Sequence, residues 1–294
     1  MKTIAVLTDF SERAEHAAVY ALQLAKKIKA NILLFNAFIV PADTPMAGQL
    51  VWPVSDYEEI KKDTEKGLAK LAKKFEKELK EQHTIGAFLP AVSYQCEEGA
   101  VANNIAALEE NRDIIMLVMA THGADEISAF MFGNNCRQVI DAATVPVLIV
   151  PSKARIRNIE KFAFATDITY SDVQYIRSLS GLAKRFSAEV MITNVSPDNP
   201  LDSQRDTAVR LFMEDVAKEV DYSKINYLSI PNNSVKKGLE WLIENVKFDI
   251  LVMVHRKSTF FEFLFRSSMT KKIADHTVVP LLVYPYPASS VPSF

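Results

Sequence analysis

Short polar segments follow several apolar runs of this sequence, and they are the residues best placed to bind a ligand. Hydroxyl, carboxylate and amide groups can hydrogen-bond a ligand, while glycine, which has no Cβ, lets main chain approach a phosphate closely. Glycine is scarce: only eight of the 294 residues are glycine, whereas glycine makes up ~7% of residues in an average protein. The candidate segments in the first half are Thr8-Asp9, Asn36-Ala37 and residues 119–123 (Met119, Ala120, Thr121, His122 and Gly123), and in the second half Thr166-Asp167, Asn194 and residues 254–257.

These segments are related by an internal repeat. Residues 4–9 (IAVLTD) match residues 162–167 (FAFATD), and residues 30–36 (ANILLFN) match residues 188–194 (AEVMITN) in the same register. Further along, residues 117–119 match residues 251–253, and the offset between matched residues is smaller by 24. The chain therefore contains two copies of one unit, and the first copy is longer in its middle.

Each copy alternates short apolar runs with amphipathic segments. In the first copy, residues 4–7 predict a strand, and Ser11 predicts the N-cap of a helix whose apolar residues recur at helical spacing up to residue 28. The remaining predicted elements are a strand at 32–38, a charged helix around 68–79, a strand at 87–94, a helix at 100–110, a strand at 114–120, a helix at 135–142 and a strand at 145–150. The second copy follows the same order from 162 to 284.

This alternation predicts an α/β fold: two doubly wound open parallel-sheet (Rossmann-like, adenine nucleotide alpha hydrolase-like) domains in tandem, at residues 1–150 and 159–287. Residues 151–158 form the expected linker. Ligands of such sheets bind beyond the carboxyl ends of the strands, where the polar segments fall. The final apolar runs, at 145–150 and 279–284, are expected at the sheet edges, where an unpaired strand invites pairing. The two copies can therefore pair with each other.

Composition excludes several classes of protein. Hydrophobic residues make up 49% and charged residues 24%, which is typical of a globular chain. A net charge of −2 argues against a general nucleic-acid binder. Cys96 and Cys136 match no metal or redox spacing. Because the N-terminal residues lead directly into a strand pattern and no apolar run approaches ~20 residues, we expect no signal peptide, no membrane span and a cytoplasmic protein.

Three of these segments together resemble the universal stress protein family: Thr8-Asp9-Phe10-Ser11, residues 119–123, and the Val-Pro-Val-Leu-Ile-Val of residues 145–150. The tandem arrangement resembles the two-domain members of that family. Members that bind ATP carry Gly-x2-Gly-x9-Gly-Ser/Thr after the fourth strand, where backbone N–H groups surround the phosphates. The aligned residues in the first copy are Ala120, Gly123, Gly133 and Asn134, so two of the three glycines are present.

The resemblance implies a degenerate site for ATP, with Mg²⁺, or for another adenine nucleotide in the first copy. Asp9, beside Thr8, would accept hydrogen bonds from the adenine or ribose, and Ala37 and Met119 would line the base. Gly123, Gly133, Asn134 and Asn135 would hold the phosphates, with His122 as a further donor. The alternative is that Asp9 caps a helix, His122 lies in a turn and the glycines mark loop ends.

The second copy has Val254, Lys257, Ser267 and Ser268 at the aligned positions, so we expect no ATP site there. Asp167 is retained, and helix capping is its simplest role. Trp52, in the longer middle of the first copy, is either a lid or a plug, and residues 260–265 form an aromatic segment that either packs on its own domain or meets a partner.

We therefore expect a regulatory stress-response protein that binds a nucleotide, forms a homodimer or contacts a protein partner, and is not an enzyme. No catalytic motif is present in the sequence. The alternatives are a non-nucleotide-binding structural or interaction module of the same fold and, least favoured, an ATPase.

Overall fold

A computed structural model of the chain describes residues 1–40, 55–81, 86–110, 113–121, 134–197, 203–256, 279–287 and 291–294. The strands of the first half are β1 (Thr3–Leu7), β2 (Asn31–Phe38), β3 (Val92–Glu98), β4 (Ile114–Ala120) and β5 (Val147–Val150), and those of the second half are β6 (Lys161–Ala165), β7 (Glu189–Ser196), β8 (Ile225–Pro231), β9 (Ile250–His255) and β10 (Leu281–Pro285). The helices are α1 (Glu12–Ile28), α2 (Ser55–Glu81), α3 (Val101–Glu110), α4 (Asn134–Ala142), the 3-10 turn η1 (Tyr170–Asp172), α5 (Val173–Phe186), α6 (Ser203–Glu219) and α7 (Val235–Asn245).

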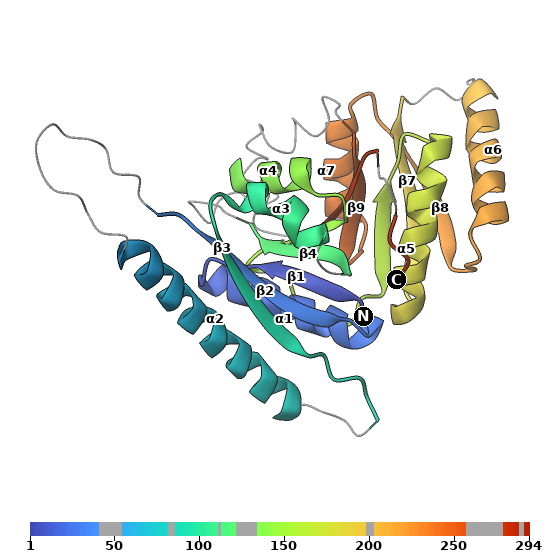
Figure 1. Ribbon diagram of the computed structural model, residues 1–294. Coiled ribbons are helices and arrows are strands. Elements are labelled where there is room, and N and C mark those ends of the chain that lie inside the picture. The colour runs from blue at the N-terminus through green and yellow to red at the C-terminus, as the bar shows by residue number, and fades with distance from the viewer. Residues whose placement is uncertain are drawn as a thin grey trace, which may run out of the picture.

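All ten strands form one sheet, in the order β3-β2-β1-β4-β5-β10-β9-β6-β7-β8 (Figure 1). Neighbouring strands within each half are parallel, whereas β5 and β10 pair antiparallel, with Leu148 opposite Leu282. The predicted pairing of the two final strands is therefore confirmed, and it places them at the centre of a continuous sheet. Because this junction is antiparallel, the carboxyl ends of the strands point in opposite directions in the two halves.

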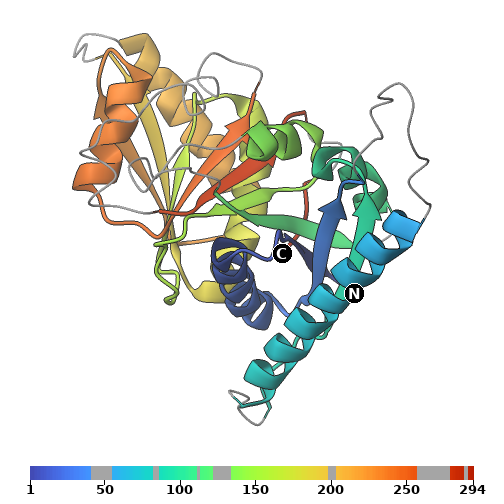
Figure 2. The same ribbon diagram turned by 90° about the vertical axis from the view of Figure 1, so that its left-hand side faces the viewer.

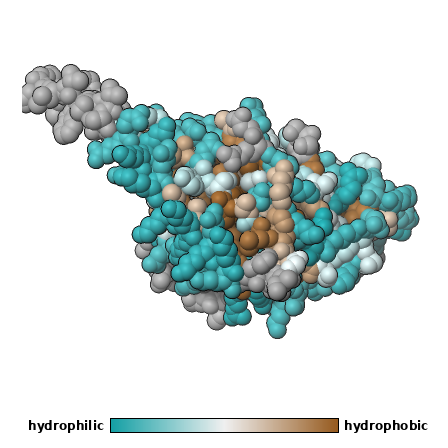
Figure 3. All heavy atoms as spheres, turned by 60° about the horizontal axis from the view of Figure 1, so that its bottom comes forward, coloured by the Kyte–Doolittle hydropathy of each residue, from teal (hydrophilic) through white to brown (hydrophobic). Residues whose placement is uncertain are grey.

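Helices cover both faces of the sheet, as an α/β fold requires (Figures 1 and 2). Buried side chains of α1, α2, α5 and α6 pack in one cluster, and those of α3, α4 and α7 pack in another. The long helix α2 lies along β2 and β3, as Figure 2 shows. Hydrophilic residues dominate the face in Figure 3, with a strip of hydrophobic residues near its centre.

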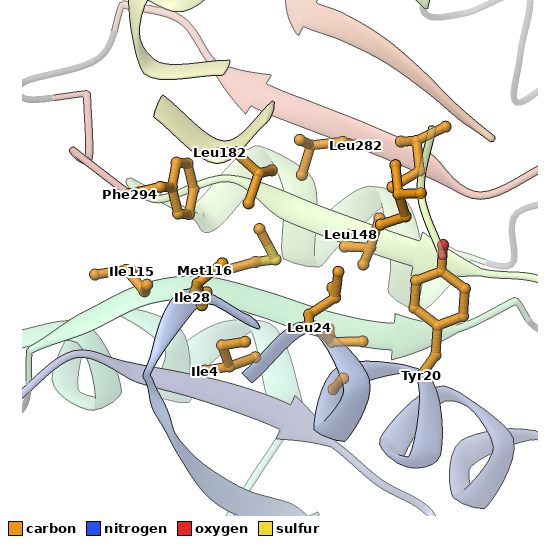
Figure 4. Close-up of a cluster of buried hydrophobic side chains, with 14 of the residues drawn as sticks. Ile4, Tyr20, Leu24, Ile28, Ile115, Met116, Leu148, Leu182, Leu282 and Phe294 are labelled. Atoms are coloured by element: carbon orange, nitrogen blue, oxygen red, sulfur yellow. The ribbon is translucent and has the colours of Figure 1, made fainter. Parts of the chain in front are cut away.

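One hydrophobic cluster crosses the junction between the halves. Leu24 of α1, Leu148 of β5, Leu182 of α5 and Leu282 of β10 lie together in Figure 4, and each is at most 2% exposed. Phe294, near them in Figure 4, is buried as well. The two halves therefore share a core rather than meeting only at a surface.

The C-terminal residues reinforce this junction through hydrogen bonds to both halves. Lys2 Nζ, just before β1, donates to the Ser293 carbonyl oxygen at 2.5 Å. Ser178 Oγ of α5 donates to the Pro292 carbonyl oxygen at 2.6 Å. Residues 291–294 thus connect the start of the first half to the first long helix of the second.

Backbone geometry supports the repeat independently of sequence. Phe10 and Ile168, at equivalent positions after the first strand of each half, have φ of 63° and 61°. Lys29 and Ser187, which end α1 and α5, have φ of 57° and 56°. Left-handed conformations are uncommon for residues with a Cβ, so their recurrence at matched positions reflects one conserved local fold.

Most predicted elements are confirmed, including the helix that Ser11 caps by accepting a hydrogen bond from the Ala14 N–H at 3.2 Å. The strand predicted at 87–94 is wrong in its bounds, because β3 begins only at Val92, after Pro90. An edge strand with several exposed polar residues gives a weak periodic signal, which explains the error.

The predicted strands at 145–150 and 279–284 begin at Val147 and Leu281, since Pro146 and Pro280 have no N–H to donate. Residues 151–158 contain neither helix nor strand.

The shared core predicts that truncations at the junction destabilise both halves together. Leu148→Ala and Leu282→Ala should each lower the free energy of unfolding by about 2–5 kcal/mol, since both side chains are buried. Because the two residues face each other, the double variant should be non-additive by about 0.5–3 kcal/mol. Urea unfolding followed by circular dichroism measures these values.

The exposed Leu211→Ala serves as the control and should change stability by less than about 0.5 kcal/mol. In a Trp52→Phe background, Trp241 is the one tryptophan left and reports on the second half. A Trp241 fluorescence midpoint that stays unchanged while the circular dichroism midpoint falls in Leu148→Ala would show that the halves unfold independently.

Candidate functional site

The ends of β1, β2 and β4 meet at one edge of the first half. Leu7 of β1 pairs with Phe35 of β2 and Met119 of β4, so the residues that follow them are neighbours. Asn36 Nδ2 donates to the Thr8 carbonyl oxygen at 2.7 Å, and both residues are buried. This edge is where ligands of open parallel sheets bind.

The turn after β1 fixes the position of Asp9. Thr8 Oγ1 accepts a hydrogen bond from the Phe10 N–H at 3.1 Å. Asp9 Oδ1 accepts from the Ser11 N–H at 3.0 Å and from Ser11 Oγ at 2.5 Å. Ser11, not Asp9, is the N-cap of α1, so the interpretation of Asp9 as the helix cap is wrong. The Asp9 side chain is exposed and is held in place through Ser11.

The start of α4 lies close to the end of β4. Cys136 Sγ, in the first turn of α4, donates to the Ala120 carbonyl oxygen at 3.7 Å. Met119 and Ala120 are buried, Ala37 is half-buried, and Asn135 is exposed at the start of the helix. A helix N-terminus attracts anions through its unpaired N–H groups and its dipole. Of the predicted residues, Thr8, Asp9, Ala37, Met119, Ala120 and Asn135 therefore come together at this edge.

The other predicted residues lie partly or wholly outside the described parts of the chain. Asn134 begins α4, but its side chain is not among those described. His122, Gly123 and Gly133 lie outside the described residues, as do Trp52, Lys257 and the aromatic segment 260–265.

The second half repeats the same framework at the opposite edge of the sheet. Thr166 Oγ1 accepts from the Ile168 N–H at 2.8 Å, and Asn194 Nδ2 donates to the Thr166 carbonyl oxygen at 2.8 Å. These bonds match those of Thr8 and Asn36. The same pattern of hydrogen bonds therefore connects the ends of the first two strands in both copies.

Arg256, which follows β9, distinguishes the second copy from the first. Its Nη1 pairs with Asp167, and its Nη2 donates to Thr169 Oγ1 at 2.6 Å, Ser171 Oγ at 2.9 Å and Asp172 Oδ1 at 2.6 Å. Its guanidinium carbon lies 5.1 Å from the centre of the Tyr286 ring. Asp167 is thus paired with an arginine, and α5 has no side-chain hydrogen bond at its N-cap, so the helix-cap interpretation of Asp167 is wrong as well.

Burial and neighbouring charges shift the pKa values of Asp172 and Arg256 in opposite directions. Burial raises the pKa of Asp172, and the hydrogen bond from Thr166 and the charge of Arg256 offset that rise only in part. Burial opposes the charged form of Arg256, but Asp172 and Asp167 outweigh it and raise the pKa of the guanidinium. Arg256 therefore stays charged and compensates a fully buried carboxylate.

A cavity of about 530 Å³ opens at the carboxyl ends of β6, β7 and β9. Its lining consists of Ala165, Thr166, Asp167, Ile168, Thr193, Asn194, Val195, Ser196, Arg205, Ala208, Val235, Leu239, Met253, Val254 and Arg256. The second copy thus contains a ligand-sized space although it lacks the glycines of the family motif.

Sequence reasoning had missed Asp172, Arg205 and Ser196. A residue-by-residue comparison of the copies contained a signal for Asp172, because it aligns with the buried Ala14 of the first copy. A carboxylate at a core position requires a charged or hydrogen-bonding partner. Neither Arg205 nor Ser196 had such a signal, since α6 and the end of β7 differ from their counterparts.

Within the described residues, no helix is long and apolar enough to cross a membrane. The same residues contain no group of three or more His, Cys, Asp or Glu side chains arranged to hold a metal ion.

Comparison with known proteins places these features in a family. Residues 1–151 match the model of the Universal stress protein family. The crystal structure of a universal stress protein from Archaeoglobus fulgidus is similar over 96% of this chain and 98% of its own, with 18% identity and a TM-score of 0.68. A protein of unknown function from Pseudomonas aeruginosa aligns with a TM-score of 0.55, at 13% identity, over 96% of this chain and 92% of its own. No curated protein matches the sequence.

Breaking the Arg256 cluster should destabilise the protein in a pH-dependent way. Arg256→Met leaves Asp172 buried without its cation and should lower the free energy of unfolding by about 3–5 kcal/mol at neutral pH. The deficit should shrink on acidification, because the variant's folded state takes up a proton on Asp172 at a higher pH than the unfolded state does. Urea unfolding at several pH values measures it.

Adding Asp172→Asn should restore part of the lost stability, since it removes the unpaired charge. Arg210→Met, on the exposed surface of α6, is the matched control. An Arg256→Met variant as stable as this control at neutral pH would contradict the assignment.

Proposed function

The chain belongs to the universal stress protein family, and we propose that it is a regulatory stress-response protein whose first half binds an adenine nucleotide, with ATP and Mg²⁺ as the leading candidate. The observation that carries this proposal is the position of α4. Its N-terminal turn is held beside the end of β4 by the hydrogen bond from Cys136 to Ala120. Phosphates bind at such helix N-termini because N–H groups point at the anion.

The other described residues of this edge support the same ligand. Exposed Asp9 is positioned to accept hydrogen bonds from a ribose or an adenine amino group, as carboxylates do. Ala37 and Met119 offer small and apolar surfaces for a flat base. Asn135 adds a side-chain amide to the helix N-terminus. In this proposal His122, Gly123, Gly133 and Asn134 complete the phosphate contacts.

Nucleotide occupancy would act as a signal, not as the start of a reaction. Hydrolysis needs a group that activates or orients water. Asp9 is engaged with Ser11, and we propose no catalytic role for the described residues around it. We therefore propose a binding protein that forms a homodimer or contacts a protein partner. These contacts change when nucleotide is bound.

A charge placed at the helix N-terminus tests the proposal. Asn135→Asp should weaken ATP binding at least tenfold in isothermal titration calorimetry, because the new carboxylate repels the phosphates. The same change should leave adenosine binding nearly unaffected, since adenosine has no phosphate. Wild-type protein should bind about one ATP per chain in this half.

Gln138→Glu is the matched control: it adds the same charge at an exposed position of the same helix, about one turn further on. It should weaken ATP binding much less than Asn135→Asp does. Absence of any nucleotide binding by the wild-type protein would favour an interaction module that uses no nucleotide, and sustained phosphate release dependent on Asp9 would favour an ATPase.

A further inference from the structure

We propose that a cavity between the two halves binds a small organic molecule that carries a phosphate monoester group. This junction cavity has a volume of about 600 Å³ and is lined by parts of the segment 153–159, the end of α7, the residues just before β9 and β10, and Tyr20 of α1. The proposal does not depend on nucleotide binding in the first half, because the junction cavity contains none of the residues expected to bind the nucleotide.

The chain that connects the halves presents its basic residues to the junction cavity. Lys153, Arg155 and Arg157 line it, whereas Ala154 and Ile156 do not. Such alternation is typical of an extended chain, in which every second side chain points to the same side. The basic residues of this connection are therefore brought to one wall of the cavity.

Hydrogen bonds fix the start of this connection against the first half. The Ala154 N–H donates to the Pro151 carbonyl oxygen at 3.0 Å, which closes a tight turn directly after β5. His16 Nε2, on α1, donates to the Ala154 carbonyl oxygen at 2.9 Å. The wall that carries Lys153 and Arg155 is thus tied to α1.

Arg157 is already compensated by an acid of the cavity wall. Its Nη2 pairs with Asp249 Oδ1 at 2.6 Å. The side chain of Asp249 is 8% exposed, and its Oδ2 accepts hydrogen bonds from the Glu160 and Lys161 N–H groups at 2.7 Å and 2.9 Å. The Arg157–Asp249 pair therefore adds no net charge to the cavity.

Three other cations of the lining are available to a ligand. Lys153, Arg155 and Lys247 are exposed, and within the part of the chain that the structure describes they have no ion-pair or hydrogen-bond partner. Opposing them are Glu244 and the C-terminus of α7, whose dipole contributes about half a negative charge. The excess of roughly one and a half positive charges matches a phosphate monoester, which carries about −1.5 to −2 at pH 7.

Tyr20 supplies a neutral hydrogen-bond donor. Its side chain is 5% exposed and lines the cavity, and Figure 4 shows its ring projecting from α1 toward the chain that follows β5. Among the described residues, its hydroxyl has no hydrogen-bond partner. Burial and the charge of Asp249 raise the pKa of Tyr20, and the charge of Arg157 offsets this only in part, so the hydroxyl keeps its proton. A phosphate oxygen beside it would gain a hydrogen bond without displacing a protein partner.

The remaining walls favour an organic phosphate over the free ion. Ile159, Ile243 and Val279 line the cavity and give part of it an apolar surface. Its volume of about 600 Å³ lies in the range of small-molecule sites, which is more than one phosphate group fills. The ligand would contact α1 of the first half and α7 of the second.

Matched pairs of phosphate esters test the proposal on the full chain. Phenyl phosphate and butyl phosphate are titrated up to millimolar concentration by calorimetry at low salt, together with their singly charged methyl esters and with inorganic phosphate. At least one monoester should bind with a stoichiometry of about one. It should bind at least about fivefold more tightly than its methyl ester, which has lost one charge, and than inorganic phosphate, which has no organic body. Phenyl and butyl groups distinguish aryl from alkyl ligands.

Two variants locate the binding. Lys153→Gln combined with Arg155→Gln should weaken binding of the monoester at least about tenfold, because it removes two unpaired cations. Lys73→Gln combined with Lys80→Gln removes the same charge from exposed positions of α2 and should not change binding. Tyr20→Phe should weaken binding about three- to tenfold, and it should fold normally because the hydroxyl has no protein partner. Circular dichroism confirms folding.

Asn135→Asp separates this site from the proposed nucleotide site and should leave monoester binding unchanged. Four results would overturn the proposal. The first is the absence of saturable binding by both monoesters, and the second is equal binding of monoester and inorganic phosphate or of monoester and methyl ester. The third is equal weakening by the Lys153/Arg155 and Lys73/Lys80 double variants. The fourth is binding that Asn135→Asp abolishes and the Lys153/Arg155 variant retains.

Discussion

The antiparallel pairing of β5 with β10 is the interaction on which the whole structure depends. Each half ends in a short apolar strand that would otherwise be an exposed edge, which is prone to association with other chains. Pairing Leu148 with Leu282 removes both edges and joins two parallel sheets into one. Because the junction is antiparallel, each helical layer continues across it, and one hydrophobic cluster extends through both halves.

The same junction places the carboxyl ends of the strands of the two halves on opposite sides of the sheet. Helix α4 spans part of the distance between them. It begins beside Ala120 at the end of β4, and Asp141 Oδ1 near its end accepts a hydrogen bond from His255 Nε2 at 2.8 Å. His255 precedes Arg256, which lines the second cavity. One helix therefore contacts both the end of β4, beside the proposed nucleotide site, and the end of β9, beside the cavity of the second half.

Much of this arrangement could be predicted from the sequence because the repeat carries it. The apolar runs and the Ser11 cap predicted the elements, and the final apolar runs, expected at sheet edges, predicted that the two copies can pair. The edge strand β3 was misplaced because its polar residues obscure the alternation. The roles of Asp9 and Asp167 were not predictable, since each depends on a partner at a different distance along the chain: Ser11 two residues away in one copy and Arg256 after β9 in the other. The cavity of the second half depends on side chains from three strands and two helices, and no motif records such a combination.

The central claim is that the carboxyl ends of β1, β2 and β4, together with the start of α4, bind an adenine nucleotide. Hydrogen–deuterium exchange with and without ATP tests it most directly, because exchange reports protection segment by segment. We predict that ATP protects the turn after β1 and the start of α4 and leaves exchange in the turn after β6 and at the end of β7 unchanged. Unchanged exchange in the turn after β1 and at the start of α4 at saturating ATP would contradict the account.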